Sequence, residues 1–291
     1  MSKRAIIQDP SAFLGFQCPP AHARAMVLPV PFEETTTYKK GTRQGPEAIL
    51  EASQQVELFD EELGLEPYLK GIHTLDEFSP VASDLAESIA QIENHARTFL
   101  SKKRILAVLG GEHSITIGLV RAHRKLYPHL SVLQIDAHAD LRPSYEGSPY
   151  NHACVMNQIV KICPAVQVGI RSMSVEESRT AARRKSRIFY ARDIVGRSGW
   201  HREALSFLTK QVYLTFDLDG LDPSIMPSVG TPEPGGMGWY ETLEFLKFVS
   251  ENRQIVGLDI VELCPQENNP GPDFLAARLV YKILGYIFES R

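Results

Sequence analysis

The sequence predicts an α/β protein in which a mostly parallel sheet lies between two layers of helices. Short apolar runs recur along the chain with helical patterns between them, and this alternation is typical of a parallel sheet flanked by helices. Several runs are almost continuously apolar, as strands covered on both faces are. Hydrophobic residues make up 43% of the 291 residues, which is enough for one large core. No linker or repeat divides the chain, so we expect a single three-layer αβα domain over residues 1–291, with about residues 1–23 as an N-terminal extension.

Eight short apolar runs are the candidates for the strands of this sheet. Because several of them lack the alternation of a half-exposed strand, we expect helices on both sides of the sheet. The expected strands are Ala25–Pro29, Gly71–Thr74, Ile105–Leu109, Leu130–Asp136, Ala165–Ile170, Arg187–Tyr190, Gln211–Asp217 and Gln254–Ile260.

Four helices are expected between and after these strands. Pro46 begins one that runs to about Leu58, because proline suits a first helical turn. Another runs from Ser79 to about Ser101 and shows apolar residues at helical spacing. These apolar positions are Val81, Leu85, Ile89 and Ile92. Two further helices are expected over Gly238–Glu251 and Pro272–Phe288.

The charge balance argues against a nucleic-acid-binding protein. The chain has 31 basic and 35 acidic side chains, which gives a net charge of −4 at pH 7. One local cluster of basic residues is interpreted as a solvated helix face and the segment after it. Its members are Arg179, Arg183, Arg184, Lys185 and Arg187.

The sequence also argues against a membrane protein and against an oxidising compartment. No apolar run reaches the roughly 18 residues that a membrane span needs. Gln8, Asp9 and Pro10 interrupt any apolar stretch of the kind found in signal peptides. The four cysteines form no CxxC pair, which argues against a disulfide framework or a thiolate zinc site. We therefore expect a soluble cytoplasmic protein.

Acidic residues and histidines directly follow four of the expected strands. In an open parallel sheet, ligands bind at the carboxyl ends of the strands. We therefore expect these side chains to meet at one edge of the sheet. The segments are Gly110–His113, Asp136–Asp140, Asp217–Asp219 and Val261–Glu262.

Six of these side chains could bind metal ions together. In an extended Asp-x-His-x-Asp segment, the three ionisable side chains would share one face, and Asp217 and Asp219 have the same spacing. The set contains no thiolate, so it favours a hard or borderline ion, and manganese suits carboxylate and imidazole ligands better than zinc does. The candidate ligands are His113, Asp136, His138, Asp140, Asp217 and Asp219.

The charge of these candidate ligands favours two ions over one. Four ionised aspartates crowded together would repel one another strongly, and two divalent cations would cancel their charge. Two ions about 3.5–4 Å apart would make a water molecule a nucleophile near neutral pH. Taken singly, His113 and Asp219 are also compatible with ordinary loop or turn residues. Three ionisable groups directly after a buried strand, however, are costly without a partner.

The three motifs that contain these residues resemble the signature motifs of the ureohydrolases. They are GGEHS at 110–114, DAHAD at 136–140 and TFDLDGLDP at 215–223, and the likeness extends from about Val27 to Ile287. This family includes arginase and agmatinase, which use a pair of manganese ions to hydrolyse guanidino groups to urea. The resemblance implies the family's αβα sandwich around an eight-stranded, mostly parallel sheet, and two Mn²⁺ ions per subunit.

The resemblance also implies how the two ions would share their ligands. One manganese ion would be held by His113, Asp136, Asp140 and Asp217. The other would be held by Asp136, His138, Asp217 and Asp219. Asp136 and Asp217 would therefore bridge the two ions.

Three further residues match functional positions of the family. Glu262, just past the last expected strand, would accept hydrogen bonds from a planar guanidinium. His152, in the loop after DAHAD, would protonate the leaving amine, a role that needs a group titrating near neutrality. Thr231 would line the substrate site, although the neighbouring prolines and glycines fit a backbone turn equally well. Taken alone, Glu262 also fits a strand-end surface residue, and His152 an ordinary loop histidine.

The resemblance favours agmatine as the substrate, which would be cleaved to putrescine and urea for polyamine synthesis. Arginases carry an asparagine soon after DAHAD, whereas Leu141, Arg142 and Pro143 follow here, as in agmatinases, and TPEPGG at 231–236 also resembles that branch. Agmatine lacks the carboxylate that the polar contacts of arginases bind. If Arg142 faced the pocket, it would repel the ammonium of agmatine and favour an acid such as guanidinobutyrate. Arginine and formiminoglutamate are the remaining alternatives.

Two other classes of protein fit the sequence less well. A non-catalytic relative that binds metal or a partner would have lost a ligand, His152 or Glu262, and all are present. A mononuclear zinc hydrolase of the deacetylase type would need fewer acidic ligands than this chain supplies. We expect a small cationic guanidino substrate, no nucleic-acid or membrane partner, and, as in relatives, a homo-oligomer in the form of a trimer or hexamer.

Overall fold

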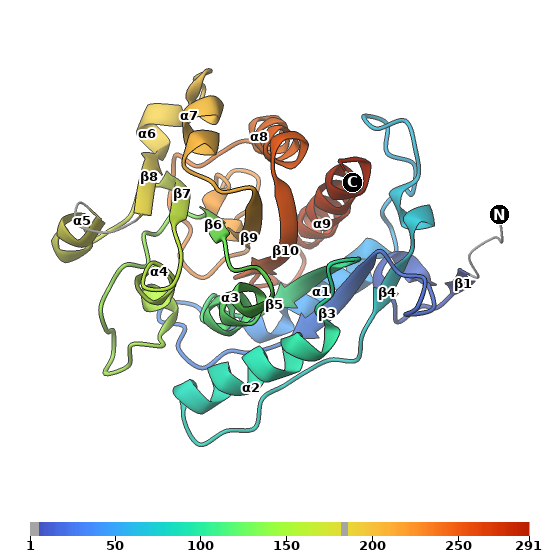
Figure 1. Cartoon of the computed structure of the whole chain (residues 1–291), viewed down its shortest axis with the longest axis horizontal. Helices are drawn as coiled ribbons and strands as arrows, with labels where there is room; N and C mark the ends of the chain where they lie inside the picture. Colours follow the sequence, from blue (N-terminus) through green and yellow to red (C-terminus); the bar gives the residue numbers. More distant parts are fainter. Residues whose placement is uncertain (1–5, 182–185, 291) are drawn as a thin grey trace.

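An eight-stranded sheet, in which all neighbouring strands run parallel, forms the centre of the structure (Figure 1). The computed structural model describes residues 6–181 and 186–290. The order of the strands across the sheet is β4-β3-β5-β10-β9-β6-β7-β8. Their bounds are β3 (Ala25–Val30), β4 (Ile72–Thr74), β5 (Ile105–Gly110), β6 (Leu130–Ile135), β7 (Ala165–Ile170), β8 (Ser186–Tyr190), β9 (Gln211–Asp217) and β10 (Gln254–Val261). All eight predicted strands are therefore present, and each predicted end lies within one residue of the observed one.

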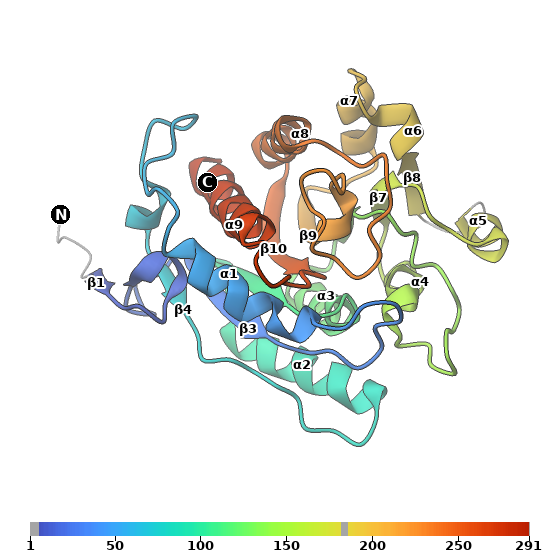
Figure 2. The same cartoon turned by 180° about the vertical axis from the view of Figure 1, so that it is seen from behind.

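Helices cover both faces of this sheet (Figures 1 and 2). On one face α1 (Gly45–Ser53), α8 (Trp239–Asn252) and α9 (Gly271–Glu289) pack together, with their apolar side chains against the strands. On the other face lie α2 (Leu85–Phe99), α3 (Ile115–Leu126) and α4 (Val155–Ile159). The shorter helices α5 (Val175–Ala181), α6 (Ala191–Ile194) and α7 (Trp200–Ser206) lie toward the β8 edge. This arrangement confirms the predicted three-layer αβα fold.

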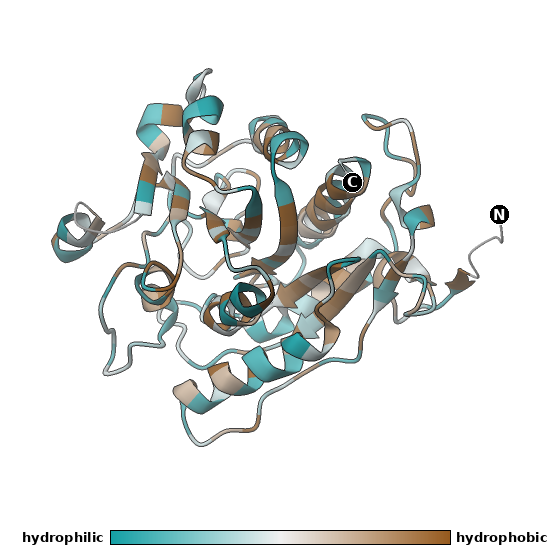
Figure 3. Cartoon of the chain, viewed as in Figure 1, coloured by the Kyte–Doolittle hydropathy of each residue, from teal (hydrophilic) through white to brown (hydrophobic). Residues whose placement is uncertain are grey.

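Burial of the strands explains why the sheet has two apolar faces. Every residue of β3, β5, β6 and β7 is buried, so these strands have no solvent-facing side on which polar residues would alternate. The strands are accordingly hydrophobic over most of their length in Figure 3.

The segment before β3 packs onto this core. A short antiparallel pair, β1 (Ile7–Gln8) and β2 (Phe16–Gln17), flanks the buried side chains of Phe13 and Leu14. The main-chain N–H of Phe13 donates to Thr74 Oγ1 at 2.9 Å, which ties the segment to β4. The single domain over the whole chain, with residues 1–23 as an extension, stays a prediction.

The second predicted helix begins at Leu85 and not at Ser79. The carboxylate of Asp84 accepts a hydrogen bond from the N–H of Glu87 at 2.8 Å, and the Glu87 carboxylate accepts one from the N–H of Ser83 at 3.1 Å. This reciprocal capping begins the helix after Asp84. Val81 therefore precedes the helix and is 88% exposed, so its predicted place on the apolar face is wrong.

Of the three remaining predicted helices, only α1 differs from its predicted bounds by more than one residue. α1 ends at Ser53 and not near Leu58, and the Ser53 hydroxyl donates to the carbonyl of Leu50 in its last turn. α8 and α9 lie within one residue of their predicted bounds.

The predicted basic cluster lies only partly in the described chain. Arg183, Arg184 and Lys185 lie outside the described residues. Arg179 is in the last turn of α5, and the guanidinium of Arg187 pairs with the carboxylate of Glu203 at 2.9 Å. Within residues 6–181 and 186–290, no helix combines the length and the hydropathy that a membrane crossing needs.

Candidate active site

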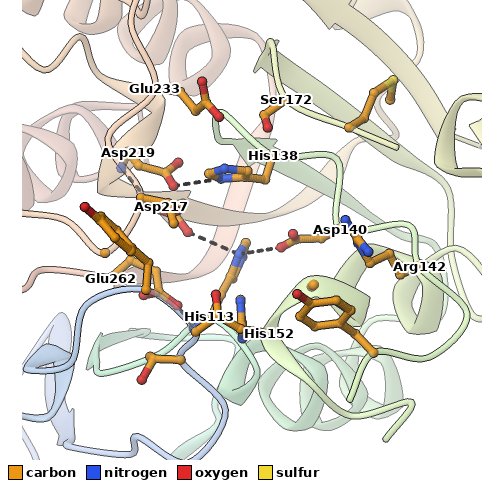
Figure 4. A pocket seen from close by; sticks show the side chains of 18 of the residues that line it. His113, His138, Asp140, Arg142, His152, Ser172, Asp217, Asp219, Glu233 and Glu262 are labelled. Carbon is orange, nitrogen blue, oxygen red and sulfur yellow. Dashed lines mark hydrogen bonds and ion pairs between the residues drawn. The ribbon is translucent and has the colours of Figure 1, made fainter. Parts of the chain in front are cut away.

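Four adjacent strands, β5, β10, β9 and β6, end at one cavity of about 370 Å³. Figure 4 shows how the predicted site residues that it labels lie around this cavity. The predicted residues that line the cavity are His113, His138, Asp140, His152, Asp217, Asp219, Thr231 and Glu262. Asp136 is fully buried beside them. The structure therefore brings together every side chain that the sequence analysis selected.

His113 Nδ1 faces three carboxylates. It lies 3.0 Å from Asp140 Oδ2, 3.2 Å from Asp136 Oδ2 and 3.4 Å from Asp217 Oδ2. The side chain is buried, and among the described residues Nδ1 has no hydrogen-bond partner of acceptable geometry. A buried ring nitrogen that converges with three carboxylate oxygens is the arrangement expected of metal ligands.

The other nitrogen of the same ring is fixed by a hydrogen-bonded threonine. His113 Nε2 lies 2.9 Å from Thr215 Oγ1, and the Thr215 hydroxyl donates to the buried carboxylate of Asp259 at 2.7 Å. Because the single hydroxyl proton goes to Asp259, Thr215 accepts the proton on Nε2. Nδ1 then carries the free lone pair. Hydrogen bonds of this kind, from the ring nitrogen that does not bind the metal, orient metal-binding histidines.

A second group of ligand atoms surrounds His138. Its Nδ1 lies 2.8 Å from Asp219 Oδ2 and 3.6 Å from Asp136 Oδ1. The N–H of Ala137 donates to Asp219 Oδ1 at 3.0 Å, and the N–H of Asp219 donates to Asp217 Oδ1 at 2.9 Å. One oxygen of each aspartate is thus held by the main chain, which leaves Oδ2 directed toward the histidines.

The backbone around these residues is unusual in two respects. A Cβ on Gly111 would lie 2.1 Å from the carbonyl oxygen of Phe32, so only glycine lets this loop pass so close to the neighbouring one. Asp140 and Glu262 have φ angles of 51° and 66°, in the left-handed region that non-glycine residues seldom occupy. Strain of this kind is often found at functional sites.

The crowded charges shift the pKa values of the candidate ligands. Burial, together with the charge of Asp136, raises the pKa of Asp140 to about 7. Burial and the charge of Asp219 raise the pKa of Asp217 well above its usual range. Burial opposes a charge on His138, but Asp219 and Asp136 outweigh it and raise the pKa to about 12. The carboxylates thus need added positive charge, which protons or cations can supply.

The residues present fit a pair of divalent cations. Two sets of ligand atoms, each within 4.8 Å of one another, share Asp136. They are His113, Asp136 and Asp140, and Asp136, His138 and Asp219. Asp217 Oδ2 adjoins the first set. Oxygen and imidazole donors without thiolate are typical of hard or borderline ions.

Glu262 lies at the wall of the cavity with its side chain almost fully buried. The N–H of His113 donates to its Oε1 at 2.6 Å, which fixes the carboxylate beside the candidate metal ligands. Burial, opposed by that hydrogen bond and assisted by the charge of Glu112, raises the pKa of Glu262 to about 8. A cation next to this carboxylate would favour its ionised form.

His152 lies across the cavity from Asp219 (Figure 4). It begins a short 3-10 helix, His152–Cys154, and its Nδ1 lies 3.1 Å from Thr35 Oγ1. Burial and the neighbouring His113 lower the pKa of His152 to about 4.

Thr231 lies in the loop after β9, which one arginine holds against the end of β7. The guanidinium of Arg171 donates to the carbonyl oxygens of Asp219 at 2.7 Å and Glu233 at 2.8 Å. The loop therefore keeps Thr231 and the Glu233 side chain at the cavity.

Arg142 does line the cavity, as one alternative in the sequence analysis required. Its guanidinium, however, lies 4.5 Å from the centroid of the Tyr145 ring and 3.7 Å from the carboxylate of buried Glu177. The neighbouring carboxylate offsets the charge that would repel a cationic substrate.

Sequence reasoning missed several residues that support the site. Asp259 carried a signal, because it is a lone carboxylate within an apolar strand. Thr215 stands in the TFDLDGLDP motif, but its contact with His113 joins segments far apart in the chain. Thr35 and Arg171 carried no signal, for the same reason. Glu112, in the GGEHS motif, also supports the site, because its carboxylate accepts hydrogen bonds from Thr35 and Ser114 among others.

A parallel αβα sheet that gathers aspartates and histidines at its carboxyl edge has the architecture of a metal-dependent hydrolase. The chain belongs to the arginase family, whose model matches residues 23–285. It is a ureohydrolase of the agmatinase-like branch, and it hydrolyses a guanidino compound.

Individual relatives support this placement over most of the chain. An N(1)-aminopropylagmatine ureohydrolase of Synechocystis is 40% identical, with 93% of this chain and 91% of the relative covered. An agmatinase of Pyrococcus horikoshii is 32% identical, with 89% and 90% covered. The crystal structure of the agmatine ureohydrolase of Thermoplasma volcanium superimposes with a TM-score of 0.84 at 31% identity, with 93% and 92% covered.

Proposed function

We propose that this chain hydrolyses agmatine or an N-aminopropyl derivative of it, and that N(1)-aminopropylagmatine is the preferred substrate. The observation that carries the reaction type is the convergence of six candidate metal ligands with Glu262 and His152 at one cavity. The preference for the extended substrate rests on the relatives, because those of about 40% identity are N(1)-aminopropylagmatine ureohydrolases. Agmatine, the substrate predicted from the sequence, is the second candidate.

The proposed cofactor is a pair of Mn²⁺ ions. His113, Asp136, Asp140 and Asp217 would hold one ion, and Asp136, His138, Asp217 and Asp219 would hold the other. When bound, the ions would activate water for attack on the guanidinium carbon. The oxygen and imidazole donors of the site support this assignment.

The protein's own groups would bind the substrate and transfer the proton. Glu262 would accept two hydrogen bonds from the planar guanidinium and so orient its carbon. His152 would give a proton to the leaving amine, because an amine leaves readily only when protonated. Thr231 would contribute to the wall beside the guanidinium.

The outer part of the cavity can receive a cationic tail. The carboxylate of Glu233 points into it, and no hydrogen bond or ion pair to that carboxylate is found within the described part of the chain. A carboxylate at the cavity without such a partner suits an ammonium group of agmatine or of its aminopropyl extension. The Glu177 carboxylate offsets the positive charge of Arg142 at the same cavity.

Urea release tests the proposed function. Agmatine, N(1)-aminopropylagmatine, arginine, guanidinobutyrate and formiminoglutamate are compared with and without added Mn²⁺. We expect the highest kcat/KM for N(1)-aminopropylagmatine and the next highest for agmatine. A higher kcat/KM for an acidic guanidino compound would refute the substrate assignment, and no urea from any of them would refute the reaction.

We further propose a cytoplasmic homo-oligomer, either a trimer or a hexamer. This proposal rests on the family alone. Light scattering at several concentrations gives the mass of the assembly.

A further inference from the structure

The Thr35 hydroxyl forms its hydrogen bonds with two residues, Glu112 and His152, and these bonds use its full capacity. It donates to Glu112 Oε1 at 2.7 Å. It lies 3.0 Å from the main-chain nitrogen of His152 and 3.1 Å from Nδ1 of the same residue. A hydroxyl has one proton and two lone pairs, so this is a complete set of partners.

The surroundings of Glu112 decide the direction of these bonds. Its carboxylate is fully buried, and the N–H groups of Glu34 and Thr35 donate to Oε2. The hydroxyls of Thr35 and Ser114 approach Oε1. Four donors surround the two oxygens, so the carboxylate acts only as an acceptor in these contacts. The Thr35 proton therefore points to Glu112.

It follows that both contacts from His152 to Thr35 must be donated by His152. The main-chain N–H supplies one proton, and Nδ1–H supplies the other. The neutral imidazole therefore carries its proton on Nδ1. Since His152 lines the cavity, Nε2 is the ring atom available to a bound substrate.

We propose that Thr35 is a positioning residue that holds His152 in the Nδ1–H tautomer, with Glu112 as the buried acceptor that orients the Thr35 hydroxyl. The proposal rests on the proposed function, in which His152 gives a proton to the leaving amine. During the reaction, Nε2 would take up the proton that the attacking water loses and then give it to the leaving amine, and the N–H electron pair would stay on Nε2. Nδ1–H remains bonded to Thr35, so the ring ends as the neutral tautomer that the site already stabilises.

Removal of the hydroxyl has a specific consequence. In a Thr35→Val variant the side-chain volume is nearly kept, but Nδ1–H loses its acceptor. The ring can then rotate or take the other tautomer, and the fraction of molecules with an unprotonated Nε2 directed at the substrate falls. Glu112 keeps its bonds from the N–H groups of Glu34 and residue 35, so the loop stays anchored.

Steady-state urea release from Thr35→Val, Thr35→Ser and Thr42→Val tests the proposal. We expect kcat of Thr35→Val to fall by roughly 10–100-fold, which is less than the rate lost when a proton-transfer group is removed altogether. KM should change less than about twofold. Thr35→Ser keeps the hydroxyl and should retain activity within a few-fold. Thr42 is a buried threonine of the same loop region whose hydroxyl has no partner in the described chain, so Thr42→Val should behave as wild type.

A double-mutant cycle separates positioning from a general effect on folding. In a His152→Ala background, Thr35→Val should reduce kcat no further, because the two residues act as one unit. An equal loss of kcat in both backgrounds would overturn the proposal, as would an inactive Thr35→Ser. Metal content and melting temperature of each variant are measured alongside.

A crystal structure of the metal-loaded Thr35→Val variant distinguishes this proposal from the proposed function. We expect the His152 ring to be turned or disordered relative to the wild type. An unchanged ring would overturn the positioning role whatever the substrate is. Absence of urea from the wild-type enzyme would refute the proposed function, and the structure would still decide the role of Thr35.

Discussion

At the level of single residues, two site histidines are oriented in the same way. Each ring donates to a threonine hydroxyl, which in turn donates to a buried carboxylate. The pairs are Thr215 with Asp259 for His113, and Thr35 with Glu112 for His152. In both cases the threonine hydroxyl donates its proton to the carboxylate, so the histidine ring must donate its N–H to the hydroxyl oxygen. The site thus presents a lone pair on His113 for a metal ion and a free Nε2 on His152 for the substrate.

Loss of the Thr215 hydroxyl should weaken metal binding. In Thr215→Val the proton on His113 Nε2 has no acceptor, so the tautomer with a lone pair on Nδ1 is no longer favoured. We expect Mn²⁺ affinity to fall by about 10–100-fold, the usual effect of removing such a support. Competition with a metal chelator measures it. Thr242→Val, in α8 away from the site, is the control, and equal affinity in both variants would contradict the expectation.

Substitution of Glu262 and His152 should separate binding from proton transfer. Glu262→Gln removes the negative charge that pairs with the guanidinium, so both KM and kcat should worsen. His152→Ala should lower kcat by roughly 10²–10⁴-fold and change KM much less.

Metal analysis of the same two variants provides the control. Both should retain the metal content of the wild type, since neither residue is proposed as a ligand. Loss of Mn²⁺ from His152→Ala would identify His152 as a ligand instead of a proton carrier. A near-normal kcat across the pH range would mean that another group protonates the amine.

The chemical residues of the site could be predicted because they occur in short motifs at strand ends. Asp136, His138 and Asp140 stand within five consecutive residues, so their proximity needs no knowledge of the fold. Thr35 and Glu112 are 77 residues apart, and Thr215 and His113 are 102 apart. Contacts of that kind depend on how loops meet above the sheet, which local spacing does not encode.

At the level of secondary structure, strands were predicted better than helices. The strands are buried on both faces, so hydrophobicity alone marks their ends. Helix ends depend on capping contacts, and Asp84 moved the start of α2 by six residues from Ser79 to Leu85. α3 was not predicted, because its sequence begins with β-branched residues and contains Gly118, all of which lower helix propensity.

Gly118 is required by the packing of α3 against α2. A Cβ there would lie 2.6 Å from the carbonyl oxygen of Ile89 and 3.1 Å from the nitrogen of Glu93, both main-chain atoms. Gly118→Ala would raise intrinsic helix propensity by about 1 kcal/mol. We expect the clash to outweigh this gain and the variant to lose about 1–3 kcal/mol of stability, as overpacked cores do.

Denaturant unfolding of metal-loaded protein measures the effect of Gly118→Ala. Gly271→Ala is the matched control, since a Cβ at that helical position meets only a side-chain atom at 3.9 Å. Its stability should stay within about 0.5 kcal/mol of the wild type. A Gly118→Ala variant more stable than the wild type would show that α2 and α3 separate without cost.

At the level of the whole molecule, the site places several like charges in the interior of the fold. In the metal-free chain, burial and Asp136 raise the pKa of Asp140 to about 7 from its usual value of 3.8. For His138, burial is outweighed by Asp219 and Asp136, so the pKa rises to about 12 from 6.5. Asp217 and Glu262, whose pKa values burial also raises, hold further protons in the folded state, and together these groups outweigh the protons that His152 and His123 lack below about pH 6.5. The folded state therefore holds more protons than the unfolded state between about pH 4 and pH 12. By linkage, the free energy of unfolding of the metal-free chain falls as pH rises through this window.

Bound cations should remove this dependence, because they replace the protons that the carboxylates otherwise need. We expect chelation to abolish activity and lower the melting temperature, with Mn²⁺ restoring both better than Mg²⁺. The gap in melting temperature between metal-loaded and metal-free protein should widen from pH 5 to pH 8, since only the metal-free chain loses stability as its bound protons leave. Differential scanning fluorimetry across this range measures the gap, with the same buffers and ionic strength for both forms. A gap that stays constant or narrows toward pH 8 would show that protons and cations do not compete for this site, and full activity in thoroughly demetallated protein would contradict the metal requirement itself.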